Sequence, residues 1–346
     1  MTNETVFHVT FFGLEFPLKP VAFTLPIGDG WSVYWYGILI SLGFLLAMIY
    51  AFRRAKSFKI NTDRMIDVIL VSVPAAVIVA RLYYILFDGV ASSSFADIIG
   101  IRNGGLAIYG GIIGAFIAAY FTCRWRKVDF LSLFDMASIG FLMAQAIGRW
   151  GNFFNQEAFG TATGSDFFGM TSEPIAMELG AGVMAHPCFL YEFIWCAAGF
   201  ALLHFYSKKR KFKGEIFLMY LAWYGFGRFF IEMLRTDQLK IGPVPVSVVL
   251  SGIVCAASVA LLIMKRRKMQ GSRAPEYKPV FQDVADGMNA GGARTYDEGE
   301  DTLEDEVLDT SSEDIREEAP RAGDEIDVSL SDLPEIPEDE NGEDGE

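Results

Sequence analysis

The sequence is poor in the residues that build metal centres and disulfide frameworks. Its 346 residues include four cysteines and three histidines. The cysteines lie in or beside apolar runs and lack the paired spacing of metal ligands, so neither a disulfide framework nor a zinc site is indicated. Three separated histidines argue against a histidine-rich metal centre.

The first thirty residues lack the basic start and apolar core of a secretory signal peptide. They form a mixed aromatic stretch that is interrupted by Pro17, Pro20 and Pro26. We therefore expect no cleavable signal peptide in this stretch.

The chain also lacks a uniform charge. Hydrophobic residues make up 52% of it, yet the net charge is −14. Residues 272–346 hold 26 acidic and 5 basic residues, whereas residues 1–271 hold 17 acidic and 24 basic residues. A basic, apolar body is therefore joined to an acidic tail that is too poor in apolar residues to bury a core. This division excludes an acidic soluble enzyme, and the short, scattered basic clusters of the body argue against a nucleic-acid binder.

Long apolar stretches dominate residues 1–270. A helix needs roughly 17–25 mostly apolar residues to cross a hydrocarbon core of about 30 Å. Several of the stretches contain charged residues, among them Arg81, Asp135 and Arg228, and these charges need partners or a polar cavity. Seven stretches have the required length, and they cover residues 31–52, 65–87, 106–123, 130–150, 187–206, 215–234 and 246–264.

Lys and Arg residues are divided unequally between alternate connections of these stretches. Positive residues are retained on the cytoplasmic side of a membrane. One set of connections carries seventeen Lys and Arg residues and the other set carries four. The pattern predicts an all-α polytopic membrane protein with seven transmembrane helices, an N-terminus outside and a cytoplasmic C-terminus.

Composition also predicts how the chain is divided. The connection at about 151–186 is long, rich in Gly, Phe and Thr, and free of Lys and Arg, which indicates a small extracytoplasmic subdomain. It belongs to the membrane domain of residues 1–270. Residues 271–346 are predicted to form a disordered, acidic cytoplasmic tail.

The densest polar group lies in residues 148–160, where the fourth stretch ends. Arg149 and Asn152 would share a helix face if the helix continues that far, and Gly151 allows another backbone to approach closely. A guanidinium beside amide donors suits an anionic headgroup. The alternative is an interfacial arginine that extends its side chain to the membrane surface.

Opposite charges alternate along the sixth stretch. Arg228 and Glu232 are four residues apart and Glu232 and Arg235 are three apart, so they share one helix face. One interpretation is a self-neutralising ion pair that lets the helix insert. The other is that Glu232 holds Arg228 in place to bind a substrate phosphate.

Glycines and aromatic residues mark the third stretch. Gly110 and Gly114 form a small-xxx-small pattern, which allows close helix packing. Packing explains Tyr109 less readily, although an aromatic belt at the membrane surface accounts for Tyr109 and Tyr36 without any role in a site. The same caution applies to His186 at the start of the fifth stretch.

Residues 148–160 contain the complete pattern Gly-Arg-x-Gly-Asn-Phe-x-Asn-x-Glu-x-x-Gly. Through this specific pattern the sequence resembles the prolipoprotein diacylglyceryl transferases. Weaker fragments match in family order between about residues 30 and 265, and the acidic tail falls outside the resemblance. These fragments are Trp35-Tyr36-Gly37, Asn103-Gly104-Gly105 with Tyr109-Gly110-Gly111, His186-Pro187 with Leu190-Tyr191-Glu192, and Gly227-Arg228 with Glu232 and Arg235.

The resemblance implies a multi-pass enzyme of the bacterial cytoplasmic membrane with its active site toward the outer face. Such enzymes transfer the sn-1,2-diacylglyceryl group of phosphatidylglycerol to the thiol of the lipobox cysteine in a prolipoprotein signal peptide. A thioether forms and glycerol 1-phosphate is released, as the first step of bacterial lipoprotein maturation. The implied partners are phosphatidylglycerol, the prolipoprotein and the lipid bilayer, without nucleic acid, metal ion or cofactor.

The resemblance also implies the residues of the site. Guanidiniums would stabilise charge on the departing phosphate and ease thiolate formation. Some family members carry His where this chain has Tyr109, so a histidine base cannot be placed there, and Tyr109, Glu157 and His186 all stay candidates for the base. We expect the catalytic residues Arg149, Arg228, Tyr109 and Glu157, and the phosphatidylglycerol ligands Arg149, Asn152, Asn155, Tyr36, Arg228, Glu232, Gly104 and His186.

Two other classes of membrane protein compete with an enzyme. In a transporter or channel for an anionic solute, the same arginines would line a permeation path. The concentration of charged residues near one side and the lack of an apparent inverted repeat argue against it. The other class is a lipid-binding membrane protein without catalysis.

Overall fold

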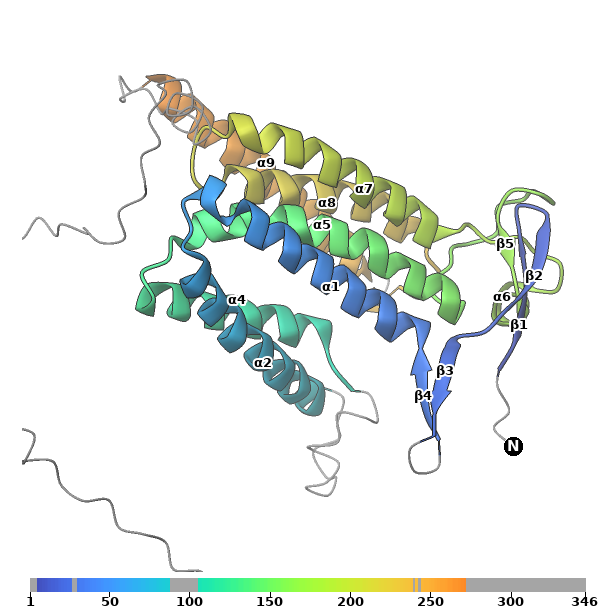
Figure 1. Cartoon of the computed structure of the whole chain (residues 1–346). Helices are drawn as coiled ribbons and strands as arrows, with labels where there is room; N and C mark the ends of the chain where they lie inside the picture. Colours follow the sequence, from blue (N-terminus) through green and yellow to red (C-terminus); the bar gives the residue numbers. More distant parts are fainter. Residues whose placement is uncertain (1–4, 27–29, 88–104, 239, 242–243, 272–346) are drawn as a thin grey trace, which may run out of the picture. The chain divides into compact units, whose positions relative to one another are not determined.

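The computed structural model describes residues 5–26, 30–87, 105–238, 240–241 and 244–271. The predicted tail and the predicted ligand Gly104 lie outside the described residues. The elements, labelled as in Figure 1, are β1 (Phe7–Phe11), β2 (Leu14–Leu18), β3 (Val21–Leu25), β4 (Trp31–Tyr34), α1 (Trp35–Arg54), η1 (Ala55–Phe58), α2 (Thr62–Phe87), α4 (Ile108–Trp125), α5 (Phe130–Asn155), β5 (Met170–Thr171), α6 (Glu173–Leu179), α7 (Cys188–Tyr206), η4 (Ser207–Lys209), α8 (Glu215–Leu234), β6 (Lys240–Ile241), β7 (Val244–Pro245) and α9 (Val246–Gly271).

Six helices of the described chain are long and apolar enough to cross a membrane, namely α1, α2, α4, α5, α7 and α9. Many of their apolar side chains are exposed, including Leu70 at 65% and Phe121 at 67%, as a lipid-facing surface requires. The chain is therefore a helical, multi-pass membrane protein. Helix α8 also forms over the predicted range, but Arg228 and Glu232 lower its hydropathy, so the count of seven stays a prediction.

Successive long helices run in opposite directions, as Figure 1 shows. The connections at 53–64, 124–127 and 208–213 therefore gather at one end of the helices, which we call the basic end. Strands β1 to β5 lie at the opposite end, which we call the strand end. This alternation agrees with the unequal distribution of Lys and Arg residues, while the orientation in a membrane stays a prediction.

Small residues bring α1 and α5 into close contact. A Cβ atom on Gly43 would lie 3.1 Å from the carbonyl oxygen of Ala144, and one on Gly140 would lie 3.4 Å from the Cβ of Ala47. The two helices are antiparallel, and small residues at both of these contacts let the two backbones approach closely.

Glycines likewise join α4 to α2. A Cβ atom on Gly110 would lie 2.7 Å from the carbonyl oxygen of Val79, and one on Gly114 would lie 2.9 Å from that of Ala75. The small-xxx-small pattern therefore serves packing in this protein. An ion pair between Asp67 and Arg126 adds a second link between the two helices.

The subdomain at the strand end combines segments that are distant in sequence. Strand β1 pairs antiparallel with both β2 and β5, so the N-terminal residues 7–18 join the predicted subdomain of 151–186. Its core contains Val9 and Ile175 together with Phe153 and Phe189 from the ends of α5 and α7. Helix α5 continues to Asn155, five residues beyond the predicted end of the fourth stretch.

At the basic end, a buried carboxylate joins α5 to the start of α8. Asp135 on α5 is fully buried and accepts a hydrogen bond from Arg210 at 2.9 Å. Its oxygens also accept bonds from the backbone N–H groups of Gly214 at 2.7 Å and Phe217 at 2.9 Å, at the start of α8. This explains how the fourth stretch tolerates an aspartate: the charge is paired and hydrogen-bonded.

We expect Asp135→Asn to lower the free energy of unfolding by about 3–5 kcal/mol, because it removes the buried charge that pairs with Arg210 at 2.9 Å. Asp129→Asn is the matched control, since Asp129 and Lys213 form an exposed pair and Asn keeps the helix cap that Asp129 provides. Unfolding titrations in mixed micelles measure both variants. Equal losses in the two variants would contradict a special role for Asp135.

Candidate functional site

One buried carboxylate organises the polar cluster at the strand end. Glu192 lies on the first turns of α7 and is 3% exposed. One of its oxygens is 2.6 Å from Arg149 Nε on α5, and the other is 2.5 Å from a guanidinium nitrogen of Arg228 on α8. Three helices therefore meet at a single side chain, which holds two guanidiniums close together.

A second buried carboxylate holds Arg228 from its own helix. Glu232, which is 2% exposed, is 2.5 Å from Arg228 and 3.7 Å from Arg235. The plus, minus, plus face predicted for the sixth stretch thus exists as a connected network. Arg235 also lies 3.7 Å from Glu192.

The three guanidiniums of the network are matched by three carboxylates. Arg149, Arg228 and Arg235 share the two buried carboxylates Glu192 and Glu232. Asp237, which is half exposed, neutralises mainly Arg235, to which it is hydrogen-bonded at 2.8 and 2.6 Å. Partial burial opposes the charged form of Asp237, but the bonds from Arg235 outweigh it and lower the pKa of that carboxyl. Arg149 keeps the capacity to bind an anion, because its Nε contacts Glu192 while its two terminal nitrogens contact the neutral side chains of Asn152 and Tyr224.

Paired indole rings fix α7 against α8 beside the cluster. Trp195 and Trp223 stack with their ring centroids 4.2 Å apart. Each indole N–H donates to the backbone carbonyl of the other residue, at 2.9 and 3.0 Å. Glycines at 199 and 227 make room for the two rings. This clasp holds the helices of Glu192 and Arg228 in register.

A chain of amides extends from Arg149 toward solvent. Arg149 donates to the Asn152 side-chain oxygen at 3.3 Å, so the two residues share the helix face that their spacing predicts. Asn152 donates in turn to the exposed carboxylate of Glu157 at 2.9 Å, and Asn155 donates to the same oxygen at 3.3 Å. Four predicted site residues are thereby joined in one hydrogen-bonded series.

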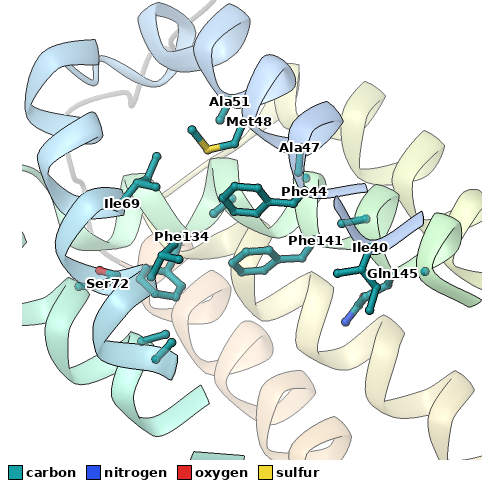
Figure 2. A pocket seen from close by; sticks show the side chains of 18 of the residues that line it. Ile40, Phe44, Ala47, Met48, Ala51, Ile69, Ser72, Phe134, Phe141 and Gln145 are labelled. Atoms are coloured by element: carbon teal, nitrogen blue, oxygen red, sulfur yellow. The ribbon is translucent and has the colours of Figure 1, made fainter. Parts of the chain in front are cut away.

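An apolar cavity opens beside Arg149. It has a volume of about 670 Å³ and is lined by residues of α1, α2, α4 and α5. Figure 2 shows apolar side chains such as Phe44, Met48 and Ile69 around it. Tyr36, Arg149 and Asn152 contribute polar groups to the lining. The cavity therefore suits a molecule with long apolar chains and an anionic group at one end.

Tyr36 lines this cavity, and its ring lies against Gly151 of α5. A Cβ atom on Gly151 would lie 2.6 Å from Cδ2 of the Tyr36 ring and 3.4 Å from the Tyr36 Cα. Gly151 therefore provides the close approach expected from the sequence, and it places the start of α1 beside Arg149.

Two further predicted residues, His186 and Tyr109, have other surroundings than the arginine network. His186 shares a hydrogen bond of 3.0 Å with the Tyr191 hydroxyl. Tyr109 is half-buried at the start of α4, the helix that packs on α2. The structure thus brings Arg149, Arg228 and Glu232 together with the amide series, but among the described residues no hydrogen bond or ion pair joins Tyr109 or His186 to them.

Sequence reasoning gave Glu192 and Tyr224 no role in the site. Tyr224 on α8 accepts a long hydrogen bond of 3.5 Å from Arg149. An acidic residue inside an apolar stretch signals a buried partner, and this signal was present at Glu192. Its partners were not visible, since they lie on two other helices.

We expect the Glu192–Arg149 pair to show a stronger coupling energy than the Glu192–Arg235 pair, because their nitrogen to oxygen distances are 2.6 and 3.7 Å. Double-mutant cycles with Glu192→Gln, Arg149→Met and Arg235→Met, read by unfolding titrations, measure both couplings. Coupling of about 1–3 kcal/mol is expected for the shorter pair. A larger value for Arg235 would refute the central position of Arg149.

Gly151→Ala should destabilise the protein by about 1–3 kcal/mol, because the added methyl group overlaps the Tyr36 ring. Gly148→Ala, three residues away on the same helix, is the matched control, since its Cβ would meet no atom within 4 Å. The midpoints of thermal unfolding of the two variants in detergent distinguish steric overlap with Tyr36 from the general effect of replacing a helical glycine with alanine. Equal midpoints would argue against the close contact.

A protein-family model and the relatives found among curated proteins carry the same description. A family model described as prolipoprotein diacylglyceryl transferase matches residues 20–264. Among curated proteins, the phosphatidylglycerol–prolipoprotein diacylglyceryl transferase of Pediococcus pentosaceus is 41% identical over 266 residues, which cover 75% of this chain and 94% of that protein. Enzymes of the same name from Clostridium novyi and Clostridium perfringens are 41% and 43% identical, each covering 72% of this chain and 97% of the relative.

Proposed function

The chain belongs to the prolipoprotein diacylglyceryl transferase family and is a transferase, and we propose that it transfers the sn-1,2-diacylglyceryl group of phosphatidylglycerol to the lipobox cysteine of prolipoproteins. The observation that carries this proposal is the pairing of Arg149 and Arg228 on one carboxylate beside an apolar cavity. A phospholipid needs both features in one place.

The cavity has the dimensions that a lipid chain needs. Its lining on α1 extends from Tyr36 to Ala51, which corresponds to about 22 Å of helix. This exceeds the half of the ~30 Å hydrocarbon core that one leaflet fills. The acyl chains would lie along this apolar surface, and the phosphate would lie at Arg149, with Asn152 and Tyr36 beside it.

The reaction breaks one bond and forms another at the glycerol carbon of the diacylglyceryl group. The sulfur of the acceptor cysteine forms the C–S bond, the C–O bond to phosphate breaks, and glycerol 1-phosphate leaves with the electron pair. Arg149 and Arg228 stabilise the negative charge that develops on the phosphate. Glu192 and Glu232 hold these guanidiniums in place, so that little reorganisation accompanies the reaction.

The acceptor thiol must lose its proton. Guanidiniums nearby favour the thiolate, whose unperturbed pKa is about 8.5. Of the three candidate bases, Glu157 is the best placed, because its exposed carboxylate is linked through Asn152 to Arg149. His186 is engaged with Tyr191, and a phenol such as Tyr109 is a weak base in its neutral form.

We further propose seven membrane-spanning helices in the bacterial cytoplasmic membrane, with the strand end at the outer face. The basic connections at the opposite end support this orientation. It places Arg149, Arg228 and Glu157 where a lipobox cysteine emerges from the membrane. Helix α8 can span despite its charges, since Arg228 and Glu232 pair with each other inside the protein.

Transport of an anionic solute fits the structure less well. The arginines Arg149, Arg228 and Arg235 lie together at one end of the helices, and the cavity that continues from Arg149 is lined mainly by apolar side chains. A permeating anion would have to leave these arginines and enter that apolar space.

Purified protein with labelled phosphatidylglycerol and a lipobox peptide should give a lipid-modified peptide and free glycerol phosphate. Arg149→Lys and Arg228→Lys should each reduce kcat/KM at least 100-fold, because Lys keeps the charge but loses the planar guanidinium, one nitrogen of which contacts Glu192 while the others can bind the phosphate. Lys213→Ala, at the basic end, should retain full activity. Transfer at wild-type rates by either arginine variant would remove that residue from the mechanism.

A further inference from the structure

The apolar cavity is a slot that runs parallel to the helices. On α1 its lining residues recur every three or four positions between Tyr36 and Ala51, and α5 contributes lining residues from Leu133 to Asn152. Because 3.6 residues make one turn, such spacing on α1 is that of a single helix face. The slot therefore continues from the arginine network at the strand end to the start of α5 at the basic end.

Packed side chains lie where the slot reaches the basic end. Three of them are buried, since Met65, Ala119 and Leu133 are 0%, 6% and 7% exposed. Figure 2 shows Ala51 at this end of the cavity and Ile40 toward the other end. We call these residues of the basic end the blind end of the slot, namely Ala51, Met65, Ala119 and Leu133.

The connection between α1 and α2 closes the slot behind the blind end. Its residues Ala55, Phe58 and Ile60 are at most 6% exposed and belong to the same hydrophobic core as Met65. The Phe58 ring also lies 4.9 Å from the guanidinium carbon of Arg210, the partner of Asp135. An apolar chain that enters beside Arg149 therefore meets packed side chains at the far end of the slot.

The depth of the slot corresponds to an acyl chain of defined length. At a rise of 1.5 Å per residue, about 24 Å of helix separate Arg149 from Leu133. An extended chain advances about 1.2 Å per bond, as an extended polypeptide backbone does, so about 20 bonds fit. With the phosphate at Arg149, the glycerol and ester groups take up about five of these bonds. The remainder holds an acyl chain of about 16 carbons.

We propose that the blind end limits the length of the acyl chain that the transferase accepts. This inference rests on the proposed function and adds the residues that determine its lipid specificity. A chain of about 16 carbons fills the slot, whereas a longer chain has to bend or displace packed side chains. Overpacking of this kind is unfavourable, so lipids with longer chains react more slowly at low concentration.

Transfer from phosphatidylglycerols with chains of twelve, sixteen or twenty carbons, measured as kcat/KM in the same excess of detergent, tests the proposal. The wild-type protein should use the two shorter lipids similarly and the longest at least fivefold less well. Ala51→Phe adds a ring that reaches about 5 Å further, the length of about four bonds. The fivefold loss should then appear already with the sixteen-carbon lipid, while transfer from the twelve-carbon lipid is retained.

A second variant changes the slot in the opposite direction. Met65→Ala removes a long side chain from the blind end and should restore transfer from the twenty-carbon lipid. Ala51→Leu, a smaller addition, serves if Ala51→Phe fails to fold.

Ala201→Phe is the matched control. Ala201 lies on α7, is exposed and does not line the slot. This variant makes the same chemical change outside the slot and should keep the wild-type dependence on chain length.

Equal use of all three lipids by the wild-type protein, or the same dependence in wild type, Ala51→Phe and Met65→Ala, would overturn the assignment. Absence of transfer from every lipid by the wild-type protein would instead count against the proposed function. The two failures are therefore distinguishable.

Discussion

Holding two guanidiniums together inside a membrane protein is the constraint on which this structure depends. Like charges repel strongly where water is scarce, and each guanidinium requires a counter-charge. Glu192 contacts both, with one oxygen toward Arg149 and the other toward Arg228, and Glu232 adds a second carboxylate at Arg228. Because the three residues come from α5, α7 and α8, the cluster exists only when these helices are packed together. The indole clasp between Trp195 and Trp223 serves the same arrangement.

In the proposed function, the arginine cluster binds the phosphate of a phospholipid and the apolar cavity binds its acyl chains. Arginines alone would bind many anions, and an apolar cavity alone would bind many lipids. Their adjacency at Arg149 would select molecules that carry a phosphate next to long apolar chains. The glycines of α1, α5 and α4 contribute indirectly, since they let the helices of each pair approach so closely that the cavity lies between the pairs.

Much of this organisation follows from the sequence, because membrane helices and specific motifs leave strong local signals. The helical membrane character and the family are confirmed. The helix of the sixth stretch begins and ends where hydropathy predicts. The strands at residues 7–18 gave no such signal, since they are short and form only by pairing with each other and with β5. The sequence shows Glu192 as an acidic residue in an apolar run. Its partners Arg228 and Arg149 lie 36 and 43 residues away along the chain, so they can be identified only from the packing of the helices.

Helix α5 is anchored at both ends to the same neighbouring helix. Asp135 binds the start of α8 at the basic end, and Arg149 connects through Glu192 to Arg228 of α8 at the strand end. A shift of α5 along α8 by one turn would separate both sets of charges at once. These contacts therefore oppose sliding of α5 along its axis. Helices α2 and α4 are instead joined to each other by Asp67 and Arg126. The cavity thus has one wall, α5, that is held in register at both ends, and another, α2 with α4, that is joined by an ion pair of its own.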